Sequence, residues 1–159
     1  MTMISPKTKK LISYIIQKCG STTITSIMKL SYLIDLISVK KTGKQISGFQ
    51  YERYLFGPFD KGIYIYIQEL IKEKTLKERL AFTPGGDEYI VYEPTGKADR
   101  ETEGLKKTEI ALIDSVLGEL GGLGAKSLSQ IAYATGPMKK LGATMGNRKG
   151  LNKLLDLAS

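Results

Sequence analysis

The chain has 159 residues, of which 42% are hydrophobic and 25% charged, and this is the size and composition of one folded domain. Its formal net charge is +8 and it contains no histidine, which excludes the Ser-His-Asp and Cys-His pairs of many hydrolases. The single cysteine, Cys19, provides neither a disulfide nor a zinc ligand set, and it favours a cytoplasmic location. No apolar run approaches the roughly 20 residues that cross a membrane.

Two helices are predicted in the first part of the chain. The first begins at Ser5-Pro6, because serine is a good N-cap and proline fits the first helical turn, and it ends at Gly20. The second starts near residues 22–23 and runs to about residue 40, with Gly43 just beyond its end. Apolar side chains cover most of its circumference, so we expect a central helix that is packed on several sides. Asp35 lies in its narrow polar stripe, where we expect a solvent-edge or capping-network role rather than that of a catalytic acid.

Residues 46–56 are rich in β-branched and aromatic residues with polar ones between them, which predicts an extended segment. Tyr51 and Arg53 would point to one side of this segment and Tyr54 to the other. Gly57-Pro58 follows, and because proline is favoured at the start of a helix, we predict a third helix from about residue 59 to residue 74.

A β-hairpin is predicted next. Residues 80–83 and 88–93 are strand-like and flank the turn formers Pro-Gly-Gly-Asp. Residues 94–104 are typical of a surface loop. Three acids of that loop are interpreted as solvated side chains: Asp99, Glu101 and Glu103.

Three further helices are expected: one capped at Thr108 and ending before the glycines at 121–124, one over residues 127–135, and one near residues 151–155. The predicted fold class is mostly α (α+β), a compact helical domain of about five to six helices. The 80–93 hairpin would form a small antiparallel sheet that residues 50–55 could join. We expect one domain over residues 1–159, with a basic C-terminal segment from about residue 137.

Charge is distributed unevenly along this sequence. Residues 1–50 hold eight lysines and one acid, residues 51–120 hold ten basic and fourteen acidic side chains, and residues 121–159 hold six basic and one acidic. Basic ends could attract a nucleic acid or an acidic protein, but scattered lysines also serve simply to keep a protein in solution. Charge alone therefore does not separate these interpretations.

A phosphate-binding loop is not predicted. Gly124-Ala125-Lys126-Ser127 lacks the glycine that should directly precede the lysine, and a helix rather than a strand is expected before it. We interpret these glycines as turns and expect no nucleotide, metal or other cofactor.

The most informative region is residues 28–70. It contains MKLSYLID, then GKQISG, then YERY, then GPF, then an Ile-Tyr pair that leads to Leu70. This order and spacing resemble the Panacea domain of SocA-like antitoxins, and AKSLSQI with Pro137 is similar to the closing helix of that family. The resemblance covers about residues 8–140. Tyr133 stands where many members carry histidine, and the tryptophan often found after the closing proline is missing, which indicates a divergent member.

The resemblance implies an antitoxin that binds and neutralises a cognate protein toxin without catalysis. Some members act as adaptors that deliver the toxin to a protease, and chaperoning is a further possible mode. Aromatic residues and arginine commonly anchor protein interfaces, so we expect the partner-binding residues in the corner between the extended segment and the third helix. They are Tyr51, Arg53, Tyr54, Gly57, Pro58, Phe59 and Tyr64. We expect Arg53 to serve binding more than stability.

Two other functions remain open from the sequence. Residues 112–135 resemble a loose helix-turn-helix, for which the 80–93 hairpin could be a wing. In this alternative, a winged-helix-like transcriptional regulator would contact DNA through Lys139, Lys140, Arg148 and Lys149. The third hypothesis is an enzyme that uses tyrosine, lysine or aspartate.

Overall fold

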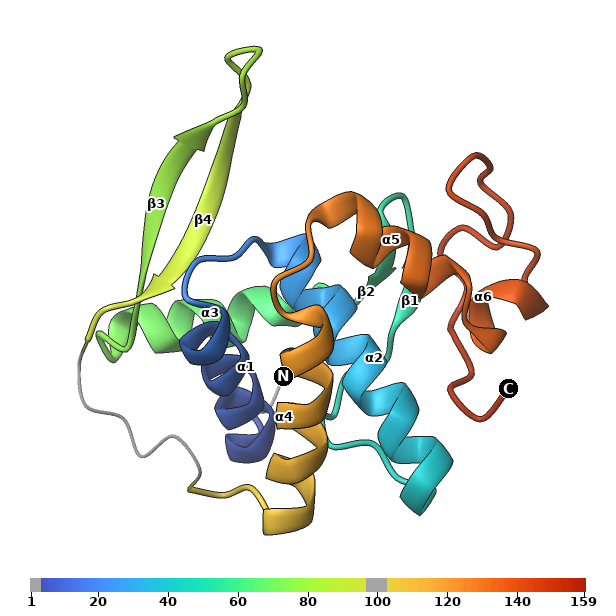
Figure 1. The fold of residues 1–159 in the computed structure, drawn as a ribbon, viewed down its shortest axis with the longest axis horizontal. Helices are drawn as coiled ribbons and strands as arrows, with labels where there is room; N and C mark the ends of the chain where they lie inside the picture. The colour runs from blue at the N-terminus through green and yellow to red at the C-terminus, as the bar shows by residue number, and fades with distance from the viewer. Residues whose placement is uncertain (1–3, 97–102) are drawn as a thin grey trace.

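The computed structural model describes residues 4–96 and 103–159 (Figure 1). Within these residues, helices alternate with two separate antiparallel sheets of two strands each, which confirms the expected α+β class. The elements in chain order are α1 (Pro6–Cys19), α2 (Ile24–Thr42), β1 (Glu52–Tyr54), β2 (Gly57–Phe59), α3 (Ile63–Lys72), β3 (Leu76–Phe82), β4 (Glu88–Pro94), α4 (Lys107–Leu120), α5 (Ala125–Tyr133) and α6 (Gly136–Lys140).

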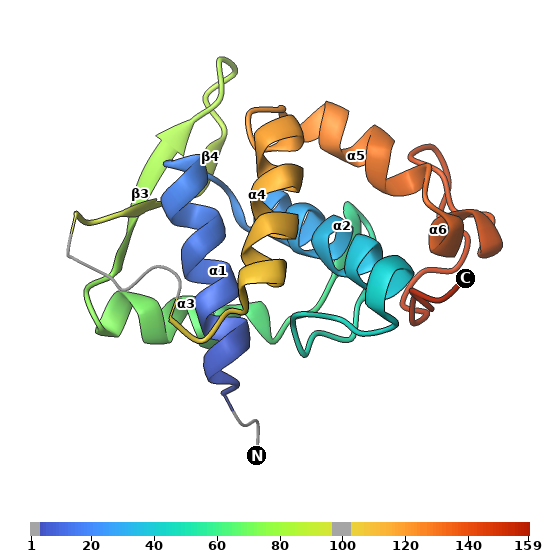
Figure 2. The ribbon, with the colours of Figure 1, turned by 60° about the horizontal axis from the view of Figure 1, so that its bottom comes forward.

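The boundaries of the first two helices agree with the predicted caps. The Ser5 side chain accepts a hydrogen bond from the Thr8 N–H, and α1 ends at Gly20. Thr23 caps α2 in the same way, and Gly43 ends it in the left-handed conformation that glycine adopts without steric cost. As expected, α2 is central: it contacts α1, α4, α5 and β2 (Figure 2).

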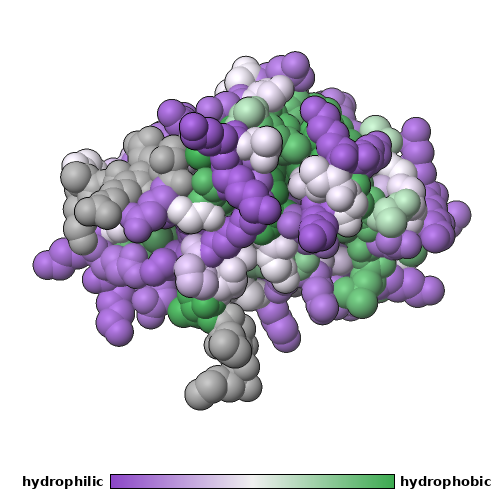
Figure 3. Space-filling model, turned by 90° about the horizontal axis from the view of Figure 1, so that it is seen from below, coloured by the Kyte–Doolittle hydropathy of each residue, from purple (hydrophilic) through white to green (hydrophobic). Residues whose placement is uncertain are grey.

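Buried apolar side chains form two clusters, and α1 and α2 contribute to both. One cluster joins these helices to α4 and includes Ile15, Ile34 and Ile113. The other surrounds the start of β1 and includes Tyr32 and Tyr51, whose rings meet edge to face. On the face seen from below, hydrophilic side chains cover most of the surface and apolar ones show between them (Figure 3). None of the described helices combines the length and apolarity that a membrane crossing requires.

The segment after β1 differs from its prediction. Pro58 does not open a helix but lies in β2, opposite Arg53 of β1, and α3 begins only at Ile63. Gly57 has φ of +117°, which reverses the chain into a tight hairpin instead of a helical turn. The Asp60 carboxylate then accepts hydrogen bonds from the backbone N–H groups of Gln50 and Gly62, so it fixes the turn that leads into α3.

The second hairpin is longer than predicted. Strands β3 and β4 have seven residues each, and β3 begins at Leu76 rather than at residue 80. This hairpin projects from the body of the molecule and is anchored to it through α1 and α3 (Figure 1). It does not share a sheet with residues 50–55, which pair with β2 instead. Of the loop acids, Glu103 is exposed, and Asp99 and Glu101 lie outside the described residues.

Two predictions for the C-terminal part are wrong. Thr108 lies inside α4 rather than at its N-cap. The N-cap is Lys106, whose backbone N–H donates a hydrogen bond to the Glu109 side chain. The helix expected near residues 151–155 does not form, and this stretch runs beside β1, where the Leu155 N–H donates to the Tyr51 carbonyl. Leucine spacing alone could not distinguish a helix from a segment that fills the edge of a hairpin.

Asp35 is fully buried in the middle of α2, so the expected solvent-edge position is wrong, and the hydrogen-bond network that it forms holds the loop at residues 46–47 rather than a helix end. Its Oδ1 accepts hydrogen bonds from the backbone N–H groups of Ile46 and Ser47, at 2.9 and 3.0 Å. Its Oδ2 accepts from the Ser47 hydroxyl and, at 2.7 Å, from the Tyr51 hydroxyl. Burial raises the pKa of this carboxyl, and these hydrogen bonds oppose the rise.

The raised pKa predicts a pH-dependent difference between the wild type and Asp35→Asn. Because the folded chain holds the Asp35 proton more tightly than the unfolded chain does, this contribution to the free energy of unfolding is complete at low pH and is lost as pH rises through the raised pKa. Urea unfolding of both proteins over a pH series should show the wild type losing stability relative to Asp35→Asn as pH increases. A difference that is constant with pH, or that changes in the opposite direction, would contradict this account.

Candidate functional site

The seven residues predicted to bind a partner gather at the β1–β2 hairpin and α3, but in two layers. Tyr51 and Arg53 are each 1% exposed and lie beneath the hairpin. Tyr54 and Tyr64 are 41% and 49% exposed, and they face solvent. Only the outer layer offers surface to a second molecule in this conformation.

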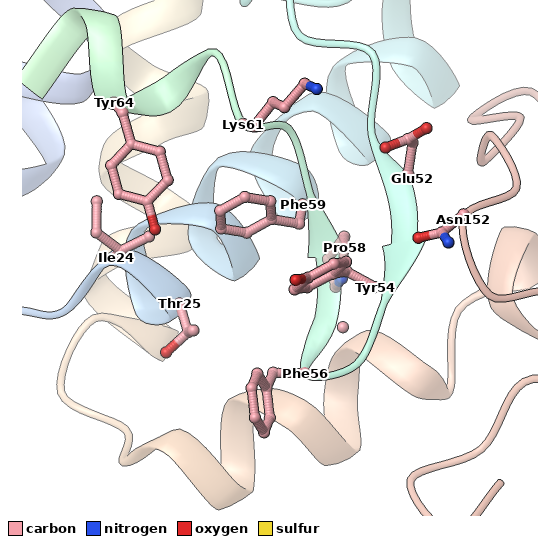
Figure 4. Close-up of a pocket in the computed structure, with 11 residues that line it drawn as sticks. Ile24, Thr25, Glu52, Tyr54, Phe56, Pro58, Phe59, Lys61, Tyr64 and Asn152 are labelled. Carbon is pink, nitrogen blue, oxygen red and sulfur yellow. The ribbon is translucent and has the colours of Figure 1, made fainter. Parts of the chain in front are cut away.

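The outer layer lines a pocket of about 510 Å³ between the N-terminal end of α2, the β1–β2 hairpin and the start of α3 (Figure 4). Five of the predicted residues line it: Tyr54, Gly57, Pro58, Phe59 and Tyr64. Six further lining residues were not predicted from the sequence: Ile24, Thr25, Glu52, Phe56, Lys61 and Asn152. We call this cavity with its eleven lining residues the aromatic pocket.

Aromatic rings form a continuous row along one wall of the pocket. The ring centroids of Tyr54 and Phe59 are 5.3 Å apart, and those of Phe59 and Tyr64 are 6.1 Å apart. Phe56, at the tip of the hairpin, adds a ring that is 65% exposed. Lys61 and Glu52 lie at the opposite side of the pocket from Phe56 (Figure 4). A concave apolar surface with few polar groups suits the insertion of an apolar side chain.

The missed residues come from parts of the chain that are distant in sequence. Ile24 and Thr25 belong to the first turn of α2, and Asn152 belongs to the C-terminal segment. Phe56 was missed for a local reason. Only the β1–β2 hairpin, which the sequence did not predict, places this residue at a turn beside the pocket. The sequence signal that could have found it is Gly57, whose positive φ makes a tight reversal at this point possible.

Gly57 is constrained by its backbone conformation, with φ of +117°, and it packs over a buried lysine. A Cβ atom at this position would lie 3.4 Å from Cε of Lys29, a buried side chain of α2. Burial lowers the pKa of the Lys29 ammonium group. Any larger residue at position 57 would therefore be strained in its backbone, while its Cβ would make an ordinary van der Waals contact with Lys29.

The Arg53 guanidinium joins the hairpin to the C-terminal segment. It donates hydrogen bonds to four backbone carbonyls: from Nη1 to Tyr54 (2.6 Å), from Nη2 to Asn147 (2.6 Å) and Thr144 (3.1 Å), and from Nε to Lys149 (3.1 Å). The guanidinium also lies over the Tyr133 ring, with its Cζ 5.1 Å from the ring centroid. The expectation that Arg53 serves binding more than stability is corrected by this geometry, because no part of the guanidinium is available at the surface.

Backbone hydrogen bonds also join the C-terminal segment to the outer edge of β1. The Arg53 N–H donates to the Lys153 carbonyl, and the Asn152 N–H donates to the Arg53 carbonyl. The C-terminal segment thus covers the edge of β1, and it places the Asn152 side chain in the wall of the aromatic pocket.

The basic residues of the DNA-binding alternative are exposed. Lys139 and Lys140 are on α6, and Arg148 and Lys149 lie in the loop that follows it. The β3–β4 hairpin packs on α1 and α3, on the other side of the molecule from α6 in both ribbon views (Figures 1 and 2). It therefore does not stand beside these residues as a wing.

Within residues 4–96 and 103–159, the side chains of Cys, Asp and Glu nowhere form a group of three that could hold a metal ion. A buried cluster of polar side chains lies beneath the hairpin. Its members hydrogen-bond to one another and are buried from solvent: Asp35, Ser47, Tyr51 and Ser31. Burial and the neighbouring Asp35 charge raise the pKa of Tyr51 well above its ordinary value.

A known family model matches most of the chain. The family model described as "Antitoxin SocA-like, Panacea domain" matches residues 27–137. This range confirms the resemblance seen in the sequence, and it includes every pocket residue except Ile24, Thr25 and Asn152. No curated protein and no solved structure matched the chain.

The position of Arg53 predicts that even a conservative change will destabilise the fold. Arg53→Lys keeps the charge but cannot reach four carbonyls with one ammonium group, and the buried acceptors that lose their donor should cost about 3 kcal/mol or more in the free energy of unfolding. Urea unfolding measures this loss. The exposed Arg148→Lys provides the control and should change stability by less than about 0.5 kcal/mol. Equal stability of the wild type and Arg53→Lys would show that the hydrogen bonds of the Arg53 guanidinium do not hold the C-terminal segment.

Proposed function

Because the chain belongs to the SocA-like antitoxin (Panacea domain) family, we propose that it neutralises a protein toxin by binding it at the aromatic pocket. The single observation that carries this proposal is the row of exposed rings around a formed cavity, within the part of the chain that the family model covers. Large aromatic side chains that are clustered on a concave surface are typical of the centres of protein interfaces.

We infer a binding role rather than catalysis. The titratable groups with the most altered environment, Asp35 and Tyr51, hydrogen-bond to each other in the interior and do not line the pocket. Charged groups that do line it, Glu52 and Lys61, lie at its rim rather than in its apolar wall (Figure 4). The pocket therefore supports recognition of a side chain better than acid–base chemistry.

Direct occlusion is the mode of neutralisation that we propose. The pocket is built between regular elements and is held from below by Arg53 and Tyr51, so it is ready to receive a partner without prior rearrangement. A preformed site loses little conformational entropy on binding. A purified toxin should therefore be inhibited by this protein alone, in a stoichiometric manner and without a protease.

The test uses the product of a small toxin gene that adjoins the gene for this chain. Co-expression should restore growth, and the two purified proteins should form a complex by calorimetry. Inhibition that requires a cellular protease would favour an adaptor role, and the absence of any complex would reject the toxin proposal.

Phe56→Ser should separate binding from folding. The Phe56 ring is 65% exposed, so its removal should change the melting temperature little, whereas loss of an interface aromatic should weaken toxin binding by about 2 kcal/mol, roughly 30-fold. Phe82→Ser is the matched control, because Phe82 is 59% exposed on the β3–β4 hairpin, away from the pocket. Calorimetric titration of both variants measures the effect. Similar losses in both, or loss only in Phe82→Ser, would show that the partner does not use the aromatic pocket.

A further inference from the structure

A basic surface begins where the aromatic pocket ends. It comprises five exposed side chains of the C-terminal part of the chain: Lys139, Lys140, Arg148, Lys149 and Lys153. The only acid between residues 121 and 159 is Asp156. We call these five residues the C-terminal basic surface, and all five lie beyond the region that the family model matches.

The structure holds this surface in place. Lys149 packs its stem toward Gly142, where a Cβ atom would lie 3.4 Å from its Cδ, and Gly150 packs closely against Leu141. The carbonyls of Thr144 and Lys149 accept hydrogen bonds from Arg53. These contacts bring the end of α6 together with the loop at residues 147–150, so the fold holds the part of the chain that carries these positive charges.

Asn152 makes the surface continuous with the pocket. Its backbone N–H donates to the Arg53 carbonyl and its side chain lines the pocket, and the next residue is the exposed Lys153. Lys61 is exposed on the rim of the same pocket. A segment that enters the pocket would thus leave it over a positively charged surface, with Glu52 as the one acid among the lining residues.

We propose that the aromatic pocket and the C-terminal basic surface together recognise an acidic segment of the partner protein, with one apolar side chain inserted in the pocket and flanking Asp or Glu residues on the basic surface. This inference rests on the proposed function and adds the chemistry of the toxin segment that is bound. Opposite charges around an apolar anchor give specificity and speed association.

Apolar side chains among the basic residues favour a protein over a nucleic acid as the occupant. Met145 and Leu154 are exposed within this C-terminal segment, and phosphate groups would gain nothing from contact with them. The exposed face of α5 offers few groups for reading bases, mainly Lys126 and Gln130. An apolar centre with a charged rim is the usual composition of a protein interface.

The experiment selects ligands without the toxin. The full chain is immobilised and panned against a phage-displayed library of random peptides, and the enriched peptides are synthesised and titrated by fluorescence anisotropy at low and high salt. We expect enriched peptides to share an apolar residue flanked by acids, and we expect Phe56→Ser to abolish their binding. Enrichment of peptides without acids, or no enrichment over the bare support, would overturn the proposal.

Two double charge reversals locate the binding surface. Arg148→Glu with Lys153→Glu should weaken peptide binding by about tenfold at low salt, and the loss should shrink at high salt because ions screen exposed charges. Lys106→Glu with Lys107→Glu changes the net charge equally, at the first turn of α4, where the helix dipole tolerates acids. Equal losses in both variants would show only a general charge effect and would overturn the assignment of this surface.

Labelled duplex DNA is titrated in parallel. DNA that binds more tightly than the peptides and competes with them would make this a nucleic-acid surface, contrary to the proposal. Because the toxin is absent from these assays, acidic peptides that bind as expected while the toxin does not would reject the toxin assignment alone. A toxin that binds independently of Arg148 and Lys153 would reject the acidic segment and leave the proposed function in place.

Discussion

The buried Asp35 carboxylate determines where β1 begins, and the site depends on that position. A charge in the interior is costly unless hydrogen bonds compensate it, and here two backbone N–H groups and two hydroxyls supply them. These bonds return the chain to the middle of α2 after the turn at Gly43 and fix Tyr51 against Ser31. β1 begins at the residue after Tyr51, so the hydrogen bonds of this one carboxylate fix the position of the hairpin and of the pocket that it lines.

Strand alternation along β1 separates the residues that hold the fold from the residues that line the aromatic pocket. Tyr51 and Arg53 point inward and tie the strand to α2 and to the C-terminal segment, whereas Glu52 and Tyr54 point outward and line the pocket. Neighbouring residues of one short strand therefore have opposite tasks. A substitution at an inward-pointing position therefore acts on folding, whereas one at an outward-pointing position alters the wall of the aromatic pocket.

Sequence reasoning succeeded where the signals were local. Ser5-Pro6, Thr23, Gly20 and Gly43 mark helix ends through contacts within one turn, and the alternation of Tyr51, Arg53 and Tyr54 is a property of the strand itself. It failed at Pro58, which suits a strand in a tight hairpin as well as a helix start, and at the direction of Arg53. A buried guanidinium needs acceptors, and three of its four come from residues more than 90 positions later. No local sequence pattern predicts these distant carbonyl acceptors.

The late origin of those acceptors has a consequence for biosynthesis. A nascent chain can form α1, α2 and the β1–β2 hairpin long before residues 144–155 are translated. Until then the Arg53 charge has only the Tyr54 carbonyl among its four acceptors, and the edge of β1 is open to other strands. The Arg53 guanidinium thus gains three of its four acceptors only after residues 144–149 have been translated. Products terminated before that point expose a strand edge and an uncompensated charge, features that mark a chain for degradation.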